Sequence, residues 1–193
     1  ALVVELYESL LGQRYVDRHR TRGKMLVRER IEALVDPDTP FLELSPLAGW
    51  GTQDPVGVGS ACGIGIVEGV ECAISGSDMT YRGGSGNPTT WKKGSRFHEI
   101  ARENRLPVII LNESAGADLP RQADLFIQGG ASFKDLTQLS KLGIPSITMA
   151  SPACFFRNVP PASSTSTMKL SLVSPTKISA VVRTSVTNAA TIS

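Results

Sequence analysis

A run of small residues after an apolar strand is the part of this sequence with the clearest chemical potential. Residues 107–122 read PVIILNESAGADLPRQ, and Val108 to Leu111 form the continuous apolar run expected of a strand buried on both faces. The residues beyond it have almost no side chain: Ser114, Ala115, Gly116 and Ala117. Their backbone N–H groups could approach a carbonyl oxygen and stabilise an oxyanion. The simpler alternative is that they only turn the chain toward a helix near Pro120.

Two other segments carry features that could belong to the same site. A glycine-rich turn, Tyr81 to Gly86, follows the strand Ala73 to Ser75, as the small-residue run follows its own strand. The basic segment RGKMLVRERI occupies residues 22–31. The turn lacks the GxGxxG pattern of dinucleotide-binding loops, so we set that function aside.

Taken in order, these motifs resemble the N-terminal half of the carboxyltransferase (β) subunit of biotin-dependent acyl-CoA carboxylases, a branch of the crotonase superfamily. The resemblance covers most of residues 13–150 and rests on seven pieces in family order. These are RGKMLVRERI, DPDTPFLEL, GIGIVEGVECAI, the block from Asp78 to Lys93, RFHEIARENRLPVIIL, ESAGADLPRQAD and GIPSITM. The sequence LPRQ looks more like the methylcrotonyl-CoA type than the propionyl-CoA type.

The resemblance implies a reaction and a role for the small-residue run. Family members transfer a carboxyl group from carboxybiotin, carried by a partner subunit or domain, to an acyl-CoA through an enolate. The backbone amides of Ala115, Gly116 and Ala117 are then expected to form the oxyanion hole. The family's base is the biotin ureido nitrogen, so no acid–base pair of the protein is required. Where this chain has Ala115, family members usually have glycine, and a methyl group there would add strain if the backbone needs a positive φ.

The resemblance also places the acyl-CoA pocket in the block from Asp78 to Lys93. A Gly-Gly turn would approach the CoA, and nearby cations would bind its phosphates. The expected CoA-binding residues are Arg82, Gly83, Gly84, Ser85, Lys92 and Lys93. The alternative for the two lysines is that they form the exposed start of a helix.

Other chemistry finds little support in the sequence. His19 lies among arginines, where we expect it to face solvent. His98 lies beside Phe97 in a predicted helix, where we expect a packing or surface residue and not a catalyst. Cys62, Cys72 and Cys154 have no metal-ligand spacing, so we expect structural thiols and no metal site. The basic run from Arg14 to Arg30 accompanies a formal net charge of only +2, which favours a solvated helical face or a protein-contact surface over a nucleic-acid site.

The elements that must position these residues follow from hydrophobic periodicity. We expect helices over residues 2–18 and 24–34, a short strand at 41–44, and a hairpin of strands 61–67 and 70–75 joined by Glu68-Gly69. A helix to about Arg105 should lead to the strand at 108–111, and a helix over 133–142 to a parallel strand at 146–149. The expected fold is therefore α/β, an incomplete crotonase-like (ClpP/crotonase) ββα spiral with N-terminal helices.

The composition changes near residue 151. The last glycine is Gly143 and the last carboxylate is Asp135, and the tail is rich in Ser and Thr. We expect residues 1–150 to form the carboxyltransferase domain and residues 151–193 an atypical, weakly ordered tail, in which 178–182 could add a strand. Family members continue instead into a second half that supplies the biotin side of the site.

Two functions remain open at this point. The first is the carboxyltransferase component of an acyl-CoA carboxylase, working as a homo-oligomer with a biotin-carboxylase or biotin-carrier subunit. The second is a non-catalytic paralogue or assembly subunit of such a complex. With 41% hydrophobic residues, no membrane-length apolar run and no recognisable secretory signal, we expect a cytoplasmic protein, or one of the mitochondrial matrix in a eukaryote.

Overall fold

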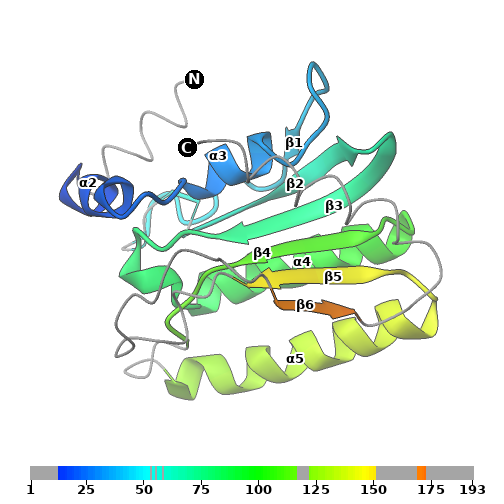
Figure 1. Ribbon diagram of the computed structural model, residues 1–193. Coiled ribbons are helices and arrows are strands. Elements are labelled where there is room, and N and C mark those ends of the chain that lie inside the picture. The colour runs from blue at the N-terminus through cyan, green and yellow to red at the C-terminus, as the bar shows by residue number, and fades with distance from the viewer. Residues whose placement is uncertain are drawn as a thin grey trace.

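A six-stranded sheet organises the chain (Figure 1). The computed structural model describes residues 13–52, 54, 56–57, 59–116, 122–150 and 169–172. The order of strands in the sheet follows their order in the sequence. The strands are β1 (Leu42–Glu43), β2 (Ser60–Val67), β3 (Val70–Ser77), β4 (Val108–Asn112), β5 (Ser146–Ala150) and β6 (Lys169–Leu172). Pairs β3–β4 and β4–β5 are parallel and the other pairs are antiparallel.

The helices confirm the predicted succession but differ in their bounds. They are α2 (Gln13–Thr21), α3 (Val27–Glu32), the 3₁₀ turn η1 (Arg82–Gly84), α4 (Pro88–Glu103) and α5 (Gln122–Lys141). Of the helix expected over residues 2–18, the part before residue 13 lies outside the described residues. The helix expected from residue 24 begins at Val27, because Leu26 is an extended N-cap residue whose N–H donates to Glu29.

Helix α5 begins eleven residues before the predicted start at Phe133. Gly129 and Gly130 interrupt the helical pattern and lower the intrinsic preference for a helix. Packing outweighs that preference, since Leu125 near the start of the helix and Leu139 near its end are both buried. The glycine pair therefore lies inside one continuous helix.

The predicted β-hairpin is confirmed, including its two-residue turn. Glu68 and Gly69 both have positive φ, 51° and 74°, as the turn geometry of tight hairpins requires. The carboxylate of Asp36 accepts hydrogen bonds from both turn amides at 2.8 Å, and the Asp36 N–H donates to the carbonyl of Ile66. The segment after α3 therefore fastens the end of the hairpin.

The sheet buries apolar side chains on both faces, as predicted for Val108 to Leu111. On one face Val27 and Ile31 of α3 pack with Ile74 and Ile109. On the other face the sheet packs against α4 and α5, through a cluster whose buried residues include Ala73, Phe97, Ala101, Val108 and Leu139. Figure 1 shows α4 and α5 running beside the strands while α3 lies near β1 and β2.

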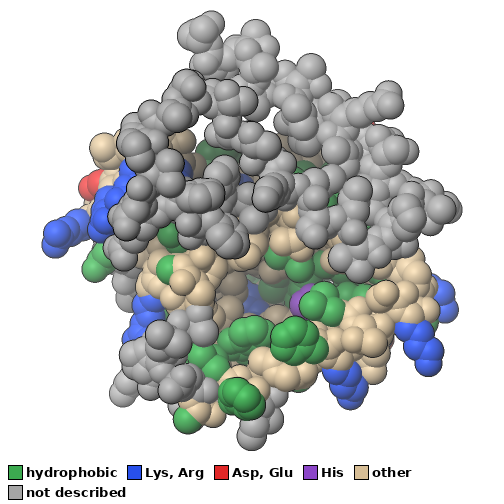
Figure 2. All heavy atoms as spheres, turned by 60° about the horizontal axis from the view of Figure 1, so that its bottom comes forward, with side chains coloured by type: hydrophobic (Ala, Val, Ile, Leu, Met, Phe, Trp, Pro, Cys, Tyr) green, Lys and Arg blue, Asp and Glu red, His purple; other side chains and the backbone are tan. Residues whose placement is uncertain are grey.

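The outer side of α5 exposes large apolar side chains. Phe126 is 86% exposed and Phe133 is 73% exposed. Figure 2 shows hydrophobic side chains gathered on the face of the molecule that carries this helix. Solvent-facing helices normally carry polar residues there, so α5 has apolar side chains on more than one side.

Part of the segment after residue 150 belongs to the sheet. Strand β6 pairs antiparallel with β5, so that Met149 lies opposite Leu170. The strand predicted at 178–182 lies outside the described residues. Within the described part of the chain, no helix is long and apolar enough to cross a membrane.

Replacing Asp36 with alanine should loosen the hairpin. Asp36→Ala removes a charged acceptor from two amides, and we expect the free energy of unfolding in urea to fall by about 1 to 2 kcal/mol. Glu71→Ala, which removes an exposed carboxylate from the same hairpin, is the control and should change it by less than about 0.5 kcal/mol. Equal losses in the two variants would contradict the assignment of Asp36 as the turn anchor.

Candidate functional site

The parallel register of β3 and β4 brings the two predicted site segments to one edge of the sheet. Gly76 lies opposite Leu111, so both strands end at the same level. The glycine-rich turn leaves β3 there, and the small-residue run leaves β4 beside it. Sites in open α/β sheets lie beyond such carboxyl ends.

The two segments are in direct contact. The Ala115 N–H donates to the carbonyl of Gly83 at 2.8 Å. A Cβ added at Gly83 would lie 3.3 Å from that of Ala115, and one added at Gly84 would overlap the carbonyl oxygen of Glu113. Both glycines have positive φ, 64° and 69°, so the turn needs glycine for its conformation and for its closeness to the neighbouring run.

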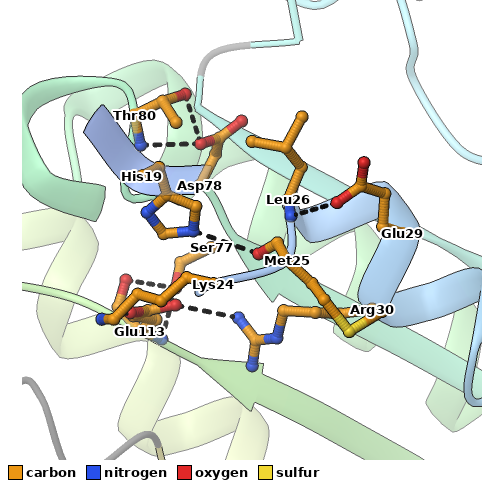
Figure 3. Close-up of polar contacts among 10 residues, drawn as sticks. All are labelled: His19, Lys24, Met25, Leu26, Glu29, Arg30, Ser77, Asp78, Thr80 and Glu113. Carbon is orange, nitrogen blue, oxygen red and sulfur yellow. Dashed lines mark hydrogen bonds and ion pairs between the residues drawn. The ribbon is translucent and has the colours of Figure 1, made fainter. Parts of the chain in front are cut away.

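Asp78 fixes the start of the glycine-rich turn. Its side chain is buried, and Oδ1 accepts hydrogen bonds from the N–H of Thr80 at 2.8 Å and from its hydroxyl at 2.5 Å. The Asp78 N–H donates to the carbonyl of Gly59. The turn therefore leaves β3 in a defined direction before it reaches Gly83 (Figure 3).

A buried carboxylate links this site to the N-terminal helices. Glu113 is 3% exposed, and its carboxylate forms ion pairs with Lys24 and Arg30, the latter at 3.5 Å. Figure 3 shows both cations approaching Glu113 from the segment that contains the start of α3. Sequence reasoning did not identify this cluster, because its members are 83 and 89 residues apart.

Part of the basic run is therefore turned toward carboxylates of the protein. Besides the ion pairs of Lys24 and Arg30 with Glu113, Arg28 binds Glu43 at 2.7 Å.

The prediction that His19 faces solvent is wrong. His19 is buried, and its Nε2 lies 3.1 Å from the carbonyl oxygen of Met25, because residues 22–26 fold back over the end of α2.

The predicted CoA-binding cations have different surroundings. Arg82 and Lys92 are exposed, whereas Lys93 is 5% exposed. The ammonium of Lys93 donates to the carbonyl of Ser60 at 2.8 Å and lies 3.4 Å from that of Gly57, and burial lowers its pKa. Ser85 Oγ donates to the carbonyl of Arg82 at 2.8 Å. The assignment of these residues to CoA stays a prediction.

The predicted oxyanion-hole residues also have local partners. The Ala115 amide is bound to Gly83, while the Gly116 N–H donates to the exposed hydroxyl of Ser114 at 3.1 Å. Gly116 has a φ of 113°, and an added Cβ would meet nothing within 4 Å. Ala117 lies outside the described residues. The role of this run as an oxyanion hole stays a prediction.

The remaining titratable groups favour structural roles. Burial raises the pKa of Cys72 to about 11 and also raises the pKa of Cys62, so both thiols stay protonated and weakly nucleophilic. His98 stacks edge to face with Phe97 at 5.2 Å, and burial lowers its pKa. The described ranges contain no group of three or more His, Cys, Asp or Glu side chains that could hold a metal ion. Cys154 lies outside those ranges.

A comparison with protein families decides the family of this chain. The model of the carboxyl transferase domain matches residues 18–155, a stretch that includes β1 to β5 and the two turns described above. The chain belongs to the carboxyl transferase domain family. The expected crotonase-like α/β fold agrees with this family.

Curated acyl-CoA carboxylase subunits are similar to about three quarters of the chain. A probable biotin-dependent acyl-coenzyme A carboxylase β2 subunit of Mycobacterium tuberculosis is 57% identical over 147 residues, covering 75% of this chain and 28% of the relative. A probable mitochondrial methylcrotonoyl-CoA carboxylase β chain of Drosophila melanogaster is 46% identical over 149 residues, covering 74% of this chain and 26% of the relative. The chain therefore spans less than a third of the length of these relatives.

A solved structure of a carboxyl transferase subunit confirms the fold. The β subunit of geranyl-CoA carboxylase from P. aeruginosa matches with a TM-score of 0.64 and 40% sequence identity, over 76% of this chain and 29% of that one. The sequence-based fold class is confirmed.

Substitution at Gly84 should separate the cost of backbone strain from the cost of disturbing the contact between the glycine-rich turn and the small-residue run. Gly84→Ala places a Cβ at positive φ against the Glu113 carbonyl, and we expect about 3 kcal/mol of destabilisation. Gly69→Ala is the matched control, since Gly69 has a φ of 74° with open space around it, and it should cost about 1 kcal/mol. Urea unfolding measures both, and equal losses would contradict a tight contact at Gly84.

Proposed function

We propose that this chain provides the acyl-CoA side of the active site in a biotin-dependent acyl-CoA carboxylase. The observation that carries the proposal is the contact between Gly83 and Ala115, which places the predicted CoA turn against the predicted oxyanion-hole run. The membership in the carboxyl transferase family supports the same reaction. Since the chain spans less than a third of its relatives, the activity of the whole protein is part of the proposal.

The proposed chemistry needs donors for a developing negative charge. When a proton leaves the carbon that is to be carboxylated, the electron pair moves toward the thioester oxygen, and an N–H aimed at that oxygen stabilises it. The Gly116 amide is the strongest candidate, because its present acceptor is the exposed Ser114 hydroxyl, which a ligand oxygen can replace. The Ala115 amide holds Gly83 in place, and Ala117 stays a proposed donor.

The carboxyl group would be supplied by carboxybiotin carried on a partner subunit or domain. Family members have the biotin-side oxyanion hole in their second half, so we assign no described residue of this chain to biotin. What the described residues offer fits the acyl-CoA instead. Arg82 within the glycine-rich turn and Lys92 in the first turns of α4 are exposed cations that could bind its phosphates.

The substrate class that we propose is a methyl-branched, α,β-unsaturated acyl-CoA. Two of the relatives described above are named for methylcrotonoyl-CoA and geranyl-CoA, which share that acyl group. In such a thioester, proton loss from the γ carbon still delivers negative charge to the thioester oxygen. The same amide donors would therefore serve this class.

The proposal extends to the assembly. We propose that the chain acts in a homo-oligomer with a biotin-carrying subunit, in the cytoplasm or the mitochondrial matrix. The exposed Phe126 and Phe133 on α5 support a further protein contact. We also keep the proposed boundary near residue 150, supported by the end of the family match at residue 155.

Gly116→Ala tests the oxyanion hole. An L side chain is strained at a φ of 113°, so the amide should turn away from the thioester oxygen, and we expect carboxyl transfer to fall about 100-fold. Gly143→Ala, which adds a methyl group at positive φ in open space after α5, should leave transfer within about twofold. The assay is transfer of labelled carboxyl to 3-methylcrotonyl-CoA by the protein assembled with its biotin-carrying partner. Unchanged transfer in Gly116→Ala would remove the assignment.

The same assay distinguishes the proposed enzyme from the alternative, a non-catalytic paralogue or assembly subunit. A wild-type assembly that forms with the biotin-carrying partner but transfers no carboxyl group to any acyl-CoA would show a non-catalytic assembly subunit. Transfer that depends on Gly116 would exclude that role.

Lys92→Met and Lys93→Met test the CoA cations. We expect Lys92→Met to weaken acyl-CoA binding about tenfold, because a charge-assisted contact to phosphate is lost, and the loss should shrink at high salt. Lys93→Met should lower the stability of the loop at Gly57 and Ser60 with little salt dependence of binding. Titration calorimetry with acyl-CoA at low and high salt measures the binding of both variants. Equal, salt-dependent losses would show that the Lys93 ammonium leaves those carbonyls for a phosphate.

A further inference from the structure

We propose that Glu113 is a positioning residue for carboxyl transfer: its buried carboxylate, held by Lys24 and Arg30, sets the main chain of residues 113–116 against the glycine-rich turn. This inference rests on the proposed function and adds a residue that does not touch the substrate. It assigns the segment that contains the start of α3 to the residues that position the proposed active site.

The side chain of Glu113 is held from outside its own strand. The side chain is 4% exposed, and its two oxygens bind different cations, Oε1 that of Lys24 and Oε2 that of Arg30 at 3.5 Å. Both cations are mostly buried as well. A carboxylate removed from water and held by two charges resists displacement, because moving it would leave buried charges without partners.

The main chain of Glu113 is held by one hydroxyl. The Glu113 N–H donates to Ser77 Oγ at 2.7 Å, and Ser77 Oγ donates to the Glu113 carbonyl at 2.7 Å. Ser77 is the last residue of β3, so this pair joins the ends of β3 and β4. The same carbonyl is the group that leaves no space for a side chain at Gly84.

These contacts matter for catalysis because of how close they are to the proposed donor. Only Ser114 and Ala115 separate Glu113 from Gly116, and the Ala115 amide is bound to Gly83. Three residues span at most about 10 Å, so a rotation of the main chain at Glu113 by about 10° can move the Gly116 amide by more than about 1 Å. Misplacement of about 1 Å can lower a rate 100-fold.

The segment that supplies the cations is itself braced. His19 contacts the carbonyl of Met25, and the Glu29 carboxylate accepts from the Leu26 N–H at 2.7 Å and from Arg20 at 3.1 Å. Figure 3 shows the contacts of His19 with Met25 and of Leu26 with Glu29 beside the Glu113 cluster. The N-terminal helices thereby define where the two cations lie.

The chain offers a matched control for the loss of a buried carboxylate. Glu43 accepts hydrogen bonds from Arg28 at 2.7 and 3.4 Å, with both side chains mostly buried, but it lies on β1. Glu43→Gln therefore removes an ion pair of the same α3 segment without touching the main chain of residues 113–116. Both Gln variants keep the size of the side chain.

The experiment compares Glu113→Gln with Glu43→Gln in the protein assembled with its biotin-carrying partner. For Glu113→Gln we expect kcat for carboxyl transfer to 3-methylcrotonyl-CoA to fall at least tenfold while KM changes less than threefold. Amide hydrogen exchange at Ala115 should become at least tenfold faster. Glu43→Gln should leave kcat within twofold and this exchange unchanged. Wild-type kcat and exchange in Glu113→Gln, or equal changes in both variants, would overturn the inference.

A second variant, measured by kcat and by amide hydrogen exchange at Ala115, allows the inference to be tested separately from the proposed function. If Glu113→Gln does not fold, Ser77→Ala removes the hydroxyl that holds the Glu113 main chain, and the same fall in kcat and faster exchange at Ala115 are expected. Wild-type values in Ser77→Ala would then overturn the inference. If the wild-type assembly transfers no carboxyl group, the proposed function fails, and the exchange readout alone decides whether Glu113 holds the run.

Discussion

The parallel pairing of β3 and β4 is the constraint on which the rest of the site depends. Because both strands end at the same edge of the sheet, the segments that follow them must share one small volume. They can share it only if side chains are nearly absent, which explains why Gly83 and Gly84 lie against Glu113 and Ala115. An exposed main chain in this fold is thus a consequence of crowding between two strand ends. The same crowding places the Ala115 amide against the carbonyl of Gly83, in a turn where Arg82 is exposed.

Charge acts in this protein mainly between segments that are distant in the sequence. Lys24 and Arg30 reach Glu113 across the sheet edge, and Arg28 reaches Glu43. Removing water from such pairs costs free energy, so their net contribution to stability is small compared with that of the apolar core. What they contribute is a fixed location for the groups involved. The part of the basic run from Lys24 to Arg30 is therefore better understood as a set of internal ion pairs than as a surface for a polyanion.

Local patterns predicted the strands, the hairpin turn and the small-residue run, because these depend on neighbours in the sequence. The Glu68-Gly69 turn and the buried strand at Val108 are examples. Contacts that depend on the direction a helix faces were not predictable in this way. Lys92 and Lys93 are adjacent in α4, yet one is exposed and the other buried, because successive residues are about 100° apart around a helix. The burial of His19 and the partners of Glu113 likewise require the tertiary fold.

The order of the strands has a consequence for how the chain assembles. Among the strands that the structure describes, each of β2 to β6 pairs with the strand that precedes it in the sequence. A sheet of this kind can grow at one edge as the polypeptide leaves the ribosome, since no early strand waits for a late one to be inserted beside it. The ion pairs of Glu113 span 83 and 89 residues and close only after β4 is synthesised. The nascent protein would therefore complete its sheet scaffold through β4 before these ion pairs fix the edge at which β3 and β4 end.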